Sequence, residues 1–236
     1  TVSESSTENT EKLKEKIKEL EHGILESKSN YNNFVILLEC TEHKSPKVIH
    51  AAIHALYRSF LPLLARGELQ KPKGPTGNDD KVTIVIWLRE NYIRYVNKLC
   101  SLLRHEEPGL QVPSLNILLE LLKVESSYLS TSSGVHHFSN NHFYRVVEGL
   151  IDNENFSEQL KTEFVKKYFN IYDDLRFYFL KDASKIINLA MDSGKPKDKS
   201  GPISKKKRTE EIPDVRLNNL MENTFAILEK LQTMPT

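Results

Sequence analysis

Cysteine is scarce in this chain of 236 residues, since only Cys40 and Cys100 occur. Two thiols cannot build a disulfide framework or a four-thiolate metal site, and each lies within an apolar stretch. We therefore expect both to be reduced core residues in a reducing compartment. The chain also lacks an uninterrupted apolar run approaching the ~18 residues that span a bilayer, so we expect no membrane partner.

An excess of charge of one sign is also missing, because 33 Lys and Arg residues face 32 Asp and Glu residues and the net charge is +1. A near-neutral chain has no overall attraction for nucleic acid, although local basic clusters can still contact phosphates. Glycine is scarce as well, with 9 residues, while 39% of the residues are hydrophobic and 28% are charged. This balance is typical of an ordered soluble chain and excludes a disordered one.

Hydrophobic residues recur at spacings of three and four, which predicts helices rather than strands. Leu13, Ile17 and Ile24, for example, lie on one narrow apolar stripe. The β-branched residues 82–87 could form a strand, but the helical period continues to Leu102 and a lone strand would have no partner. The expected helices are residues 10–27, 30–42, 45–67, 82–104, 110–125, 139–151, 156–170, 173–193 and 215–232.

The third of these helices carries its own start and stop signals. Ser45 can accept the amide hydrogens of the first turn, Pro46 fits the first helical position, and Gly67 permits a left-handed stop. Pro62 removes one backbone hydrogen bond and is expected to bend or end the helix nearby. The expected buried face is Ile49, Ile53, Leu56, Phe60 and Leu64. For the helix at 173–193, Asp173 or Asp174 is the expected cap. Its expected buried face is Phe177, Leu180, Ala183, Ile187 and Ala190.

Helix pairs of roughly 40 residues follow one another from residue 30 onward. This pattern predicts an all-α fold, an irregular α-solenoid of stacked helical hairpins like HEAT or armadillo repeats, with a globular bundle as the alternative. Turn formers predict loops at residues 70–80 and 126–134. The expected divisions are an amino-terminal helix (1–29), a helical-repeat domain (30–194), a flexible basic linker (195–213) and the start of a further helical region (214–236). Because the chain begins without Met and ends abruptly, we expect a piece of a longer protein.

Residues suited to catalysis or metal binding do not form convincing sets. The nearest approach to a metal site is Cys40, His43, His50 and His54. A second group of histidines comprises His136, His137 and His142. Neither group has the complete converging ligand set that zinc requires. Neither a Gly-x-Ser-x-Gly elbow nor a phosphate-binding glycine loop occurs, so the sequence predicts no enzyme, no cofactor and no small-molecule substrate.

Basic and aromatic residues give the remaining candidates for contact with partners. The expected linker contains the basic run Lys205, Lys206, Lys207 and Arg208. Such a run in an extended, Pro-flanked segment is typical of a nuclear localisation signal or a phosphate-contacting tether, with a plain solvated linker as the alternative. Further candidates for RNA contact are Lys71 and Lys73. Most aromatic residues between 138 and 180 are expected in the core, which leaves Tyr144, Tyr168 or Tyr178 for partners.

Several short segments, taken in order, carry a resemblance to a known family. They are residues 64–69, 87–92, 99–103, 110–112, 118–125, 143–150 and 172–178. In order and spacing they are similar to the amino-terminal half of the nucleolar complex (Noc) proteins, most closely the family's fourth member. The resemblance covers residues 34–191. The matching positions of unknown role are Arg66, Trp87, Tyr172, Asp173 and Arg176.

The resemblance implies a non-catalytic helical-repeat scaffold of the nucleus and nucleolus. It implies a role in the small-subunit processome, the 90S pre-ribosome, in pre-rRNA processing and in assembly and export of the small (40S) ribosomal subunit. The implied partners are ribosome-assembly proteins, including a Nop-type nucleolar protein, and contact with pre-ribosomal RNA stays open. The alternative is a nuclear helical-repeat adaptor in transport or signalling.

Overall fold

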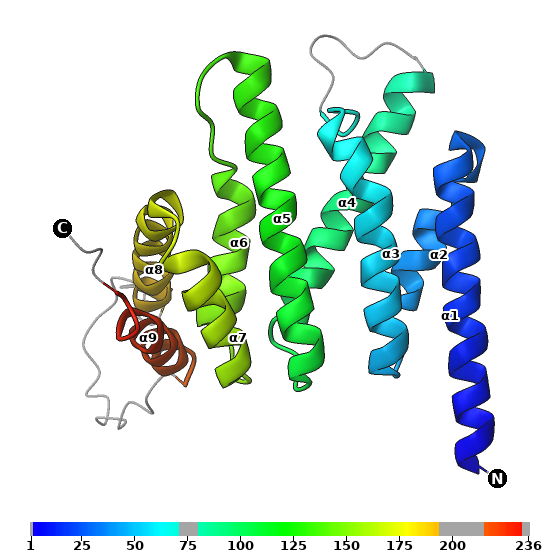
Figure 1. Cartoon of the computed structure of the whole chain (residues 1–236). Coiled ribbons are helices and arrows are strands. Elements are labelled where there is room, and N and C mark those ends of the chain that lie inside the picture. The colour runs from blue at the N-terminus through cyan, green and yellow to red at the C-terminus, as the bar shows by residue number, and fades with distance from the viewer. Residues whose placement is uncertain (1, 71–79, 194–214, 233–236) are drawn as a thin grey trace, which may run out of the picture.

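The computed structural model describes residues 2–70, 80–193 and 215–232. Within these ranges the chain forms nine α-helices and no strand (Figure 1). The helices are α1 (Val2–Glu26), α2 (Asn33–Cys40), α3 (Pro46–Ala65), α4 (Asp80–Leu102), α5 (Pro108–Ser133), α6 (Asn140–Ile151), α7 (Glu158–Phe164), α8 (Asp173–Ser193) and α9 (Val215–Leu228). A 3-10 turn, Lys28–Asn30, precedes α2, and α7 continues as a π-helical turn, Val165–Phe169.

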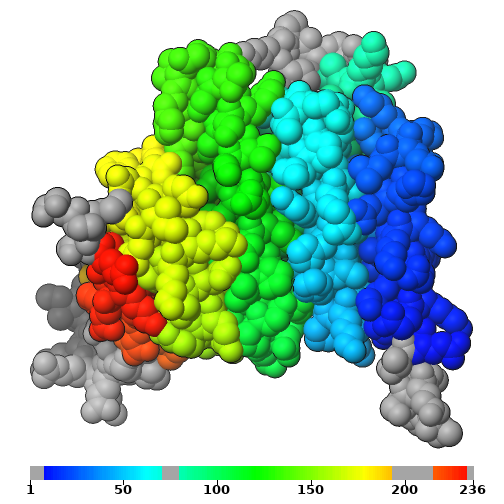
Figure 2. Space-filling model, viewed as in Figure 1, coloured from blue at the N-terminus to red at the C-terminus, as the bar shows by residue number. Residues whose placement is uncertain are grey.

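The helices pack in two layers, each of which takes every second helix of the chain. One layer consists of α1, α3, α5 and α7, and the other of α2, α4, α6 and α8, while α9 packs on α6 and α8 at the end of the row. The helices therefore follow one another along the stack in the order of the sequence, and the blue, cyan, green and yellow surfaces of α1, α3, α5 and α7 lie side by side in Figure 2. This arrangement confirms the predicted stack of helical hairpins.

Helix α3 lies at the centre of the amino-terminal half of the stack and packs against α1, α2 and α5. All five residues of its predicted apolar face are buried. Its length and composition would also let it cross a membrane, although polar residues divide its apolar positions into short runs. However, 56% of the apolar 18-residue stretch within α3 is buried inside the fold, as expected for the core helix of a helical stack.

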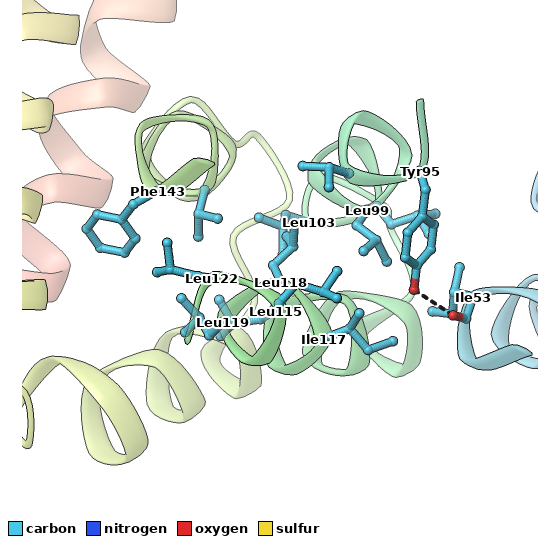
Figure 3. Close-up of a cluster of buried hydrophobic side chains, with 14 of the residues drawn as sticks. Ile53, Tyr95, Leu99, Leu103, Leu115, Ile117, Leu118, Leu119, Leu122 and Phe143 are labelled. Atoms are coloured by element: carbon cyan, nitrogen blue, oxygen red, sulfur yellow. Dashed lines mark hydrogen bonds between the residues drawn. The ribbon is translucent and has the colours of Figure 1, made fainter. Parts of the chain in front are cut away.

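Stacked aromatic rings connect α3 to its neighbours in the other layer. The ring of Phe60 stacks on Phe34 of α2 at 4.3 Å and on Tyr95 of α4 at 5.6 Å, measured between ring centroids. The buried Tyr95 hydroxyl donates a hydrogen bond of 2.6 Å to the carbonyl oxygen of Ile53 (Figure 3). Leucines of α4 and α5 fill the space between this stack and Phe143 of α6. The rings thus fix the spacing of three helices.

The predicted start and stop signals of α3 are confirmed for Pro46, which takes the first helical position, and for the end of the helix, but the side-chain cap predicted for Ser45 is wrong. The helix includes Pro62 and ends at Ala65, and Gly67 adopts the left-handed conformation with φ +72°. A Cβ atom at Gly67 would lie 2.1 Å from the Tyr128 ring, so another side chain is excluded there. The Ser45 side chain, however, makes no capping hydrogen bond. The Ser45 carbonyl oxygen instead accepts the first backbone amide hydrogens of the helix.

Residues 126–133 form the last turns of α5, so the predicted loop at 126–134 is wrong. The hydroxyl of Ser130 donates to the carbonyl oxygen of Ser126 at 2.7 Å, and that of Ser133 donates to Leu129 at 2.8 Å. Serines that bond four residues back fit within a helix, although their sequence is typical of a loop. The helix ends at Gly134, where φ is +71°.

The predicted buried face of α8 is confirmed at Ala183 and Ala190, which are buried, and at the partly buried Ile187, but it is wrong in the first half of the helix. Phe177 is 62% exposed and Leu180 is 50% exposed, whereas Phe179 and Ile186 are buried. Phe179 packs against the rings of Phe164 and Phe169, and these contacts set the rotation of the helix. Apolar residues lie on several sides of α8, so the helical period could not identify the buried side.

The carboxy-terminal part of the chain is described only in α9. This helix buries Leu220, Thr224 and Ile227, while Met221 and Phe225 are exposed. The loop around 70–80 is largely outside the described residues, as are Lys71 and Lys73. The expected linker and its basic run, Lys205, Lys206, Lys207 and Arg208, also lie outside them.

The hydrogen bond between Tyr95 and Ile53 gives a test of the packing between α3 and α4. We expect Tyr95→Phe to lower the free energy of unfolding by about 1 to 2 kcal/mol, because it removes a buried hydrogen bond and leaves its partner without that donor. Tyr57→Phe is the matched control, since the half-buried Tyr57 has no hydrogen bond among the described contacts, and a change within about 0.5 kcal/mol is expected. Urea denaturation measures the free energy of unfolding of both variants. Equal losses would show that the hydrogen bond from Tyr95 to Ile53 does not stabilise the packing of α3 and α4.

Candidate interaction surface

The positions singled out by the family resemblance fall into separate parts of the stack. Arg66 follows α3 and forms an ion pair of 2.5 Å with Glu68, and Trp87 lies half-buried in α4. Tyr172, Asp173 and Arg176 lie together at the start of α8. Ion pairing accounts for the charged positions, while Tyr172 is 48% exposed and stays available for a partner.

The start of α8 is held in place by contacts of its charged side chains. Arg176 pairs with the carboxylate of Asp173 and donates a hydrogen bond of 3.2 Å to the carbonyl oxygen of Phe169 in the π-helical turn. Asp173 and Asp174 lie inside the first turn of α8, and Asp174 accepts the backbone amide hydrogen of the next residue, Leu175, at 2.8 Å. A helix cap bonds two or three residues further on, so the predicted cap is not confirmed, although both carboxylates favour the positive end of the helix dipole. These contacts orient Tyr172, which immediately precedes the helix.

A groove of about 490 Å³ opens beside Tyr172, between α5, the connection from α5 to α6, the π-helical turn and the start of α8. We call this the α5–α8 groove. Its apolar walls come from Leu119, Leu122, Phe138 and Leu175. Tyr172 adds an exposed ring, so the groove offers aliphatic and aromatic surface to an extended segment of another molecule.

Charged and polar side chains surround the apolar walls of the α5–α8 groove. Glu120 and Asp174 supply carboxylates, and neither forms an ion pair with another described residue. Lys123 supplies one positive charge, and the exposed His136 and His137 line the groove near the end of α5. The groove therefore combines apolar walls with a slight excess of negative charge.

The three tyrosines proposed as partner contacts are mostly occupied within the fold. Tyr168 is buried, and its hydroxyl donates a hydrogen bond of 2.6 Å to Asn116. Tyr178 stacks on Phe138 at 4.1 Å between ring centroids, and Tyr144 lies beneath the ammonium group of Lys185. These three rings pack within the fold. Tyr172 is more exposed than any of them.

The sulfur and imidazole groups near α2 and α3 do not gather around one point. The rings of His50 and His54 lie 4.5 Å apart, while Nδ1 of His43 accepts the amide hydrogen of Ser45. Across the ranges that the structure describes, no three His, Cys, Asp or Glu side chains are placed to hold a metal ion. Burial raises the pKa of the Cys100 thiol to about 12, so this thiol stays protonated and a poor nucleophile.

A buried carboxylate connects α4, α5 and α6. Glu125 of α5 accepts hydrogen bonds from the Tyr92 hydroxyl at 2.6 Å and from the Ser139 hydroxyl at 2.7 Å. Nδ1 of His142 lies 3.3 Å from the same carboxylate. Burial alone would raise the pKa of Glu125, but the contacts with His142, Ser139 and Tyr92 lower it below its ordinary value. The carboxylate is therefore held ionised inside the stack.

Neither the groove nor this carboxylate was assigned a role from the sequence. For Glu125 a signal was available, because it follows Leu118, Leu121 and Leu122 on the apolar stripe of the same helix. A carboxylate on a buried stripe requires hydrogen-bond donors from other helices. The sequence gives no indication of which residues these are, since Tyr92 and His142 are distant from it along the chain.

Glu125→Gln tests the buried carboxylate. Because the pKa of Glu125 is lower in the folded chain than in the unfolded chain, its charge stabilises the fold above the unfolded pKa of about 4.3. This contribution is lost as pH falls through the folded pKa. We expect the variant to be less stable than the unchanged protein by about 1 to 3 kcal/mol at pH 7, with the difference shrinking as pH falls from 5 to 3. Urea denaturation across this range measures it, and a constant difference would count against an ionised Glu125.

Comparison with known proteins places the chain in a family. The family described as "Nucleolar complex protein 4-like, TPR repeats" matches residues 5–192. An uncharacterised protein of Schizosaccharomyces pombe is 31% identical over 186 residues, which are 77% of this chain and 37% of that protein. Nucleolar complex protein 4 of Saccharomyces cerevisiae is 24% identical over 159 residues, or 62% of this chain and 29% of the yeast protein.

A human relative, Nucleolar complex protein 4 homolog, is 28% identical over 173 residues, which are 68% of this chain and 33% of the human protein. The chain thus spans about a third of the length of these relatives. No solved structure gave a significant match. The family description specifies TPR repeats, another class of stacked helical hairpins than the HEAT and armadillo repeats expected from the sequence. The chain belongs to the nucleolar complex protein 4-like family of nucleolar helical-repeat proteins.

Proposed function

We propose that this chain is a non-catalytic scaffold of the small-subunit processome, which acts in pre-rRNA processing and in assembly and export of the small ribosomal subunit. Family membership carries the proposal, because relatives over the same helices are named for a nucleolar complex. The architecture supports it, since a two-layer helical stack offers extended surfaces and grooves for other proteins.

The scaffold acts through contacts with ribosome-assembly proteins, including a Nop-type nucleolar partner. The α5–α8 groove is the site for one of them. Its apolar walls suit an aliphatic or aromatic side chain, and the unpaired carboxylates of Glu120 and Asp174 suit a Lys or Arg next to it in the partner sequence. The partner at this groove is thus a short protein segment that combines apolar and basic residues.

A nuclear adaptor in transport or signalling would have the same architecture and different partners. Membership of the nucleolar complex protein 4-like family favours the ribosome-assembly role. Affinity capture followed by mass spectrometry separates the two functions, because the scaffold should recover ribosome-assembly factors and the adaptor should not.

Tyr172→Ala tests the groove in the full-length protein. Truncation of an aromatic anchor commonly weakens an interface by about tenfold or more, so we expect a comparable loss in the recovery of one or more assembly proteins. Ile171→Ala is the matched control, because Ile171 is 53% exposed and does not line the groove. Quantitative mass spectrometry of captured proteins measures the recovery. Equal recovery from both variants would exclude the groove as the site.

The basic run is proposed to direct the chain to the nucleus. Simultaneous replacement of Lys205, Lys206, Lys207 and Arg208 by Ala should shift a fluorescently tagged full-length protein toward the cytoplasm, because an import receptor recognises contiguous positive charge. The control replaces Lys195, Lys197 and Lys199 by Ala, which removes scattered charges from the same region of the sequence. Microscopy measures the nuclear fraction, and an unchanged fraction in the first variant would remove this role from the basic run.

A further inference from the structure

A second, smaller pocket of about 230 Å³ lies between α4, α5 and α6 and the residues that follow α3. We call it the polar pocket. It uses Glu125 and Leu129 of α5, whereas the α5–α8 groove uses Leu119, Lys123 and Ser126, so the two sites lie on different faces of that helix. The polar pocket is therefore independent of the groove and of the function proposed for it.

Two arginines line the polar pocket, Arg89 from α4 and Arg145 from α6. Arg89 donates a hydrogen bond of 3.1 Å to the carbonyl oxygen of Leu69, and Arg145 donates one of 3.1 Å to the side-chain oxygen of Asn97. A guanidinium group has five N–H donors, so each of these bonds uses one of them. Neither arginine forms an ion pair with a carboxylate in the described parts of the chain. The pocket thus collects two positive charges without their usual partners.

His142, at the start of α6, is a further polar side chain of the pocket. Its side chain is almost fully buried, with the residue 6% exposed, and it lines the same pocket. Its Nδ1 atom faces Glu125, but its buried Nε2 atom has no hydrogen-bond partner. An unpaired buried polar atom costs free energy unless a ligand or water pairs with it. A ligand oxygen against Nε2 would remove that cost when the imidazole carries a proton there.

Glu125 offsets only one of these positive charges, because two arginines and one carboxylate line the pocket and leave it net positive. Both of its oxygens already accept hydrogen bonds, one from Tyr92 and the other from Ser139, and His142 lies against the second. The start of α6 adds the positive end of a helix dipole next to the pocket, since Ser139 and Asn141 also line it. The unused N–H groups of Arg89 and Arg145 therefore suit an anionic ligand.

We propose that the polar pocket binds one anionic side chain, a phosphate monoester or a carboxylate, carried by an extended segment of a protein partner. Arginine is suited to both groups because its planar fork donates two parallel hydrogen bonds. RNA is disfavoured, since single-stranded RNA is recognised by stacking of bases on open aromatic rings. Tyr92, the one aromatic residue of the described chain that lines the pocket, is 6% exposed and offers no such ring.

Calorimetric titration of the full-length protein tests the proposal with defined probes. The probes are the peptide Ala-Ala-phosphoserine-Ala-Ala, its Glu and Ser counterparts, inorganic phosphate and a uridine oligonucleotide. We expect the phosphoserine peptide to bind at least tenfold more tightly than the Ser peptide, and inorganic phosphate to compete with it. Binding of the Glu peptide would identify carboxylates as ligands too, and its failure to bind would restrict the site to phosphate monoesters.

The arginine variants show whether the polar pocket is the site. Arg89→Gln and Arg145→Gln should each weaken binding of the phosphoserine peptide by at least about tenfold, the loss expected for a charge-assisted hydrogen bond. Arg94→Gln is the matched control, because Arg94 lies on the same helix as Arg89 and is exposed but does not line the pocket. Far-ultraviolet circular dichroism confirms that each variant folds, and His142→Gln gives a second test from α6.

Several results would overturn the proposal. The first is that neither the phosphoserine peptide nor the Glu peptide binds. The second is that Arg94→Gln weakens peptide binding as much as Arg89→Gln and Arg145→Gln do. The third is that inorganic phosphate binds and the peptides do not, which would mean that the ligand is a free anion rather than a protein segment. Binding of the oligonucleotide that is lost with Arg89→Gln and Arg145→Gln would assign the pocket to RNA instead.

Discussion

Every helix of this chain has an apolar face that only its neighbours in the stack can cover. The constraint is most severe at α3, whose buried residues contact helices of both layers. Because Phe60 stacks on rings from α2 and α4, the position of α3 sets the spacing of both helices. Stability in such a fold is approximately a sum of contacts between adjacent repeats, so a defect at α3 weakens the elements on either side of it.

This packing leaves grooves and exposed side chains along the surface of the stack. Successive helices meet along rows, and each row leaves space at its edges that side chains fill only in part. Helix α5 lies beside two such spaces, an apolar groove and a polar pocket, on different faces. The apolar residues exposed on α8, including Phe177, extend the surface toward the carboxy-terminal end. Helix α5 thus carries both of the candidate contact sites.

The sequence was sufficient to predict the helices, their order and the stack, because the apolar period and punctuation residues such as Gly67 depend on local structure. It could not predict the rotation of α8, because Phe177 and Phe179 are chemically equivalent. Phe179 is the buried one because it packs against the rings of Phe164 in α7 and Phe169 in the π-helical turn. The candidate sites were less predictable. Tyr172 was identified through the family resemblance, whereas the contact between Glu125 and His142 arises from packing of separate helices and has no local pattern.

The most direct test of the account is the ratio of small to large ribosomal subunits after depletion of the full-length protein, measured by gradient sedimentation together with pre-rRNA analysis. A scaffold of small-subunit assembly predicts a fall in the small subunit with accumulation of unprocessed precursors, both reversed by the intact protein. An unchanged subunit ratio and normal pre-rRNA processing would contradict the account.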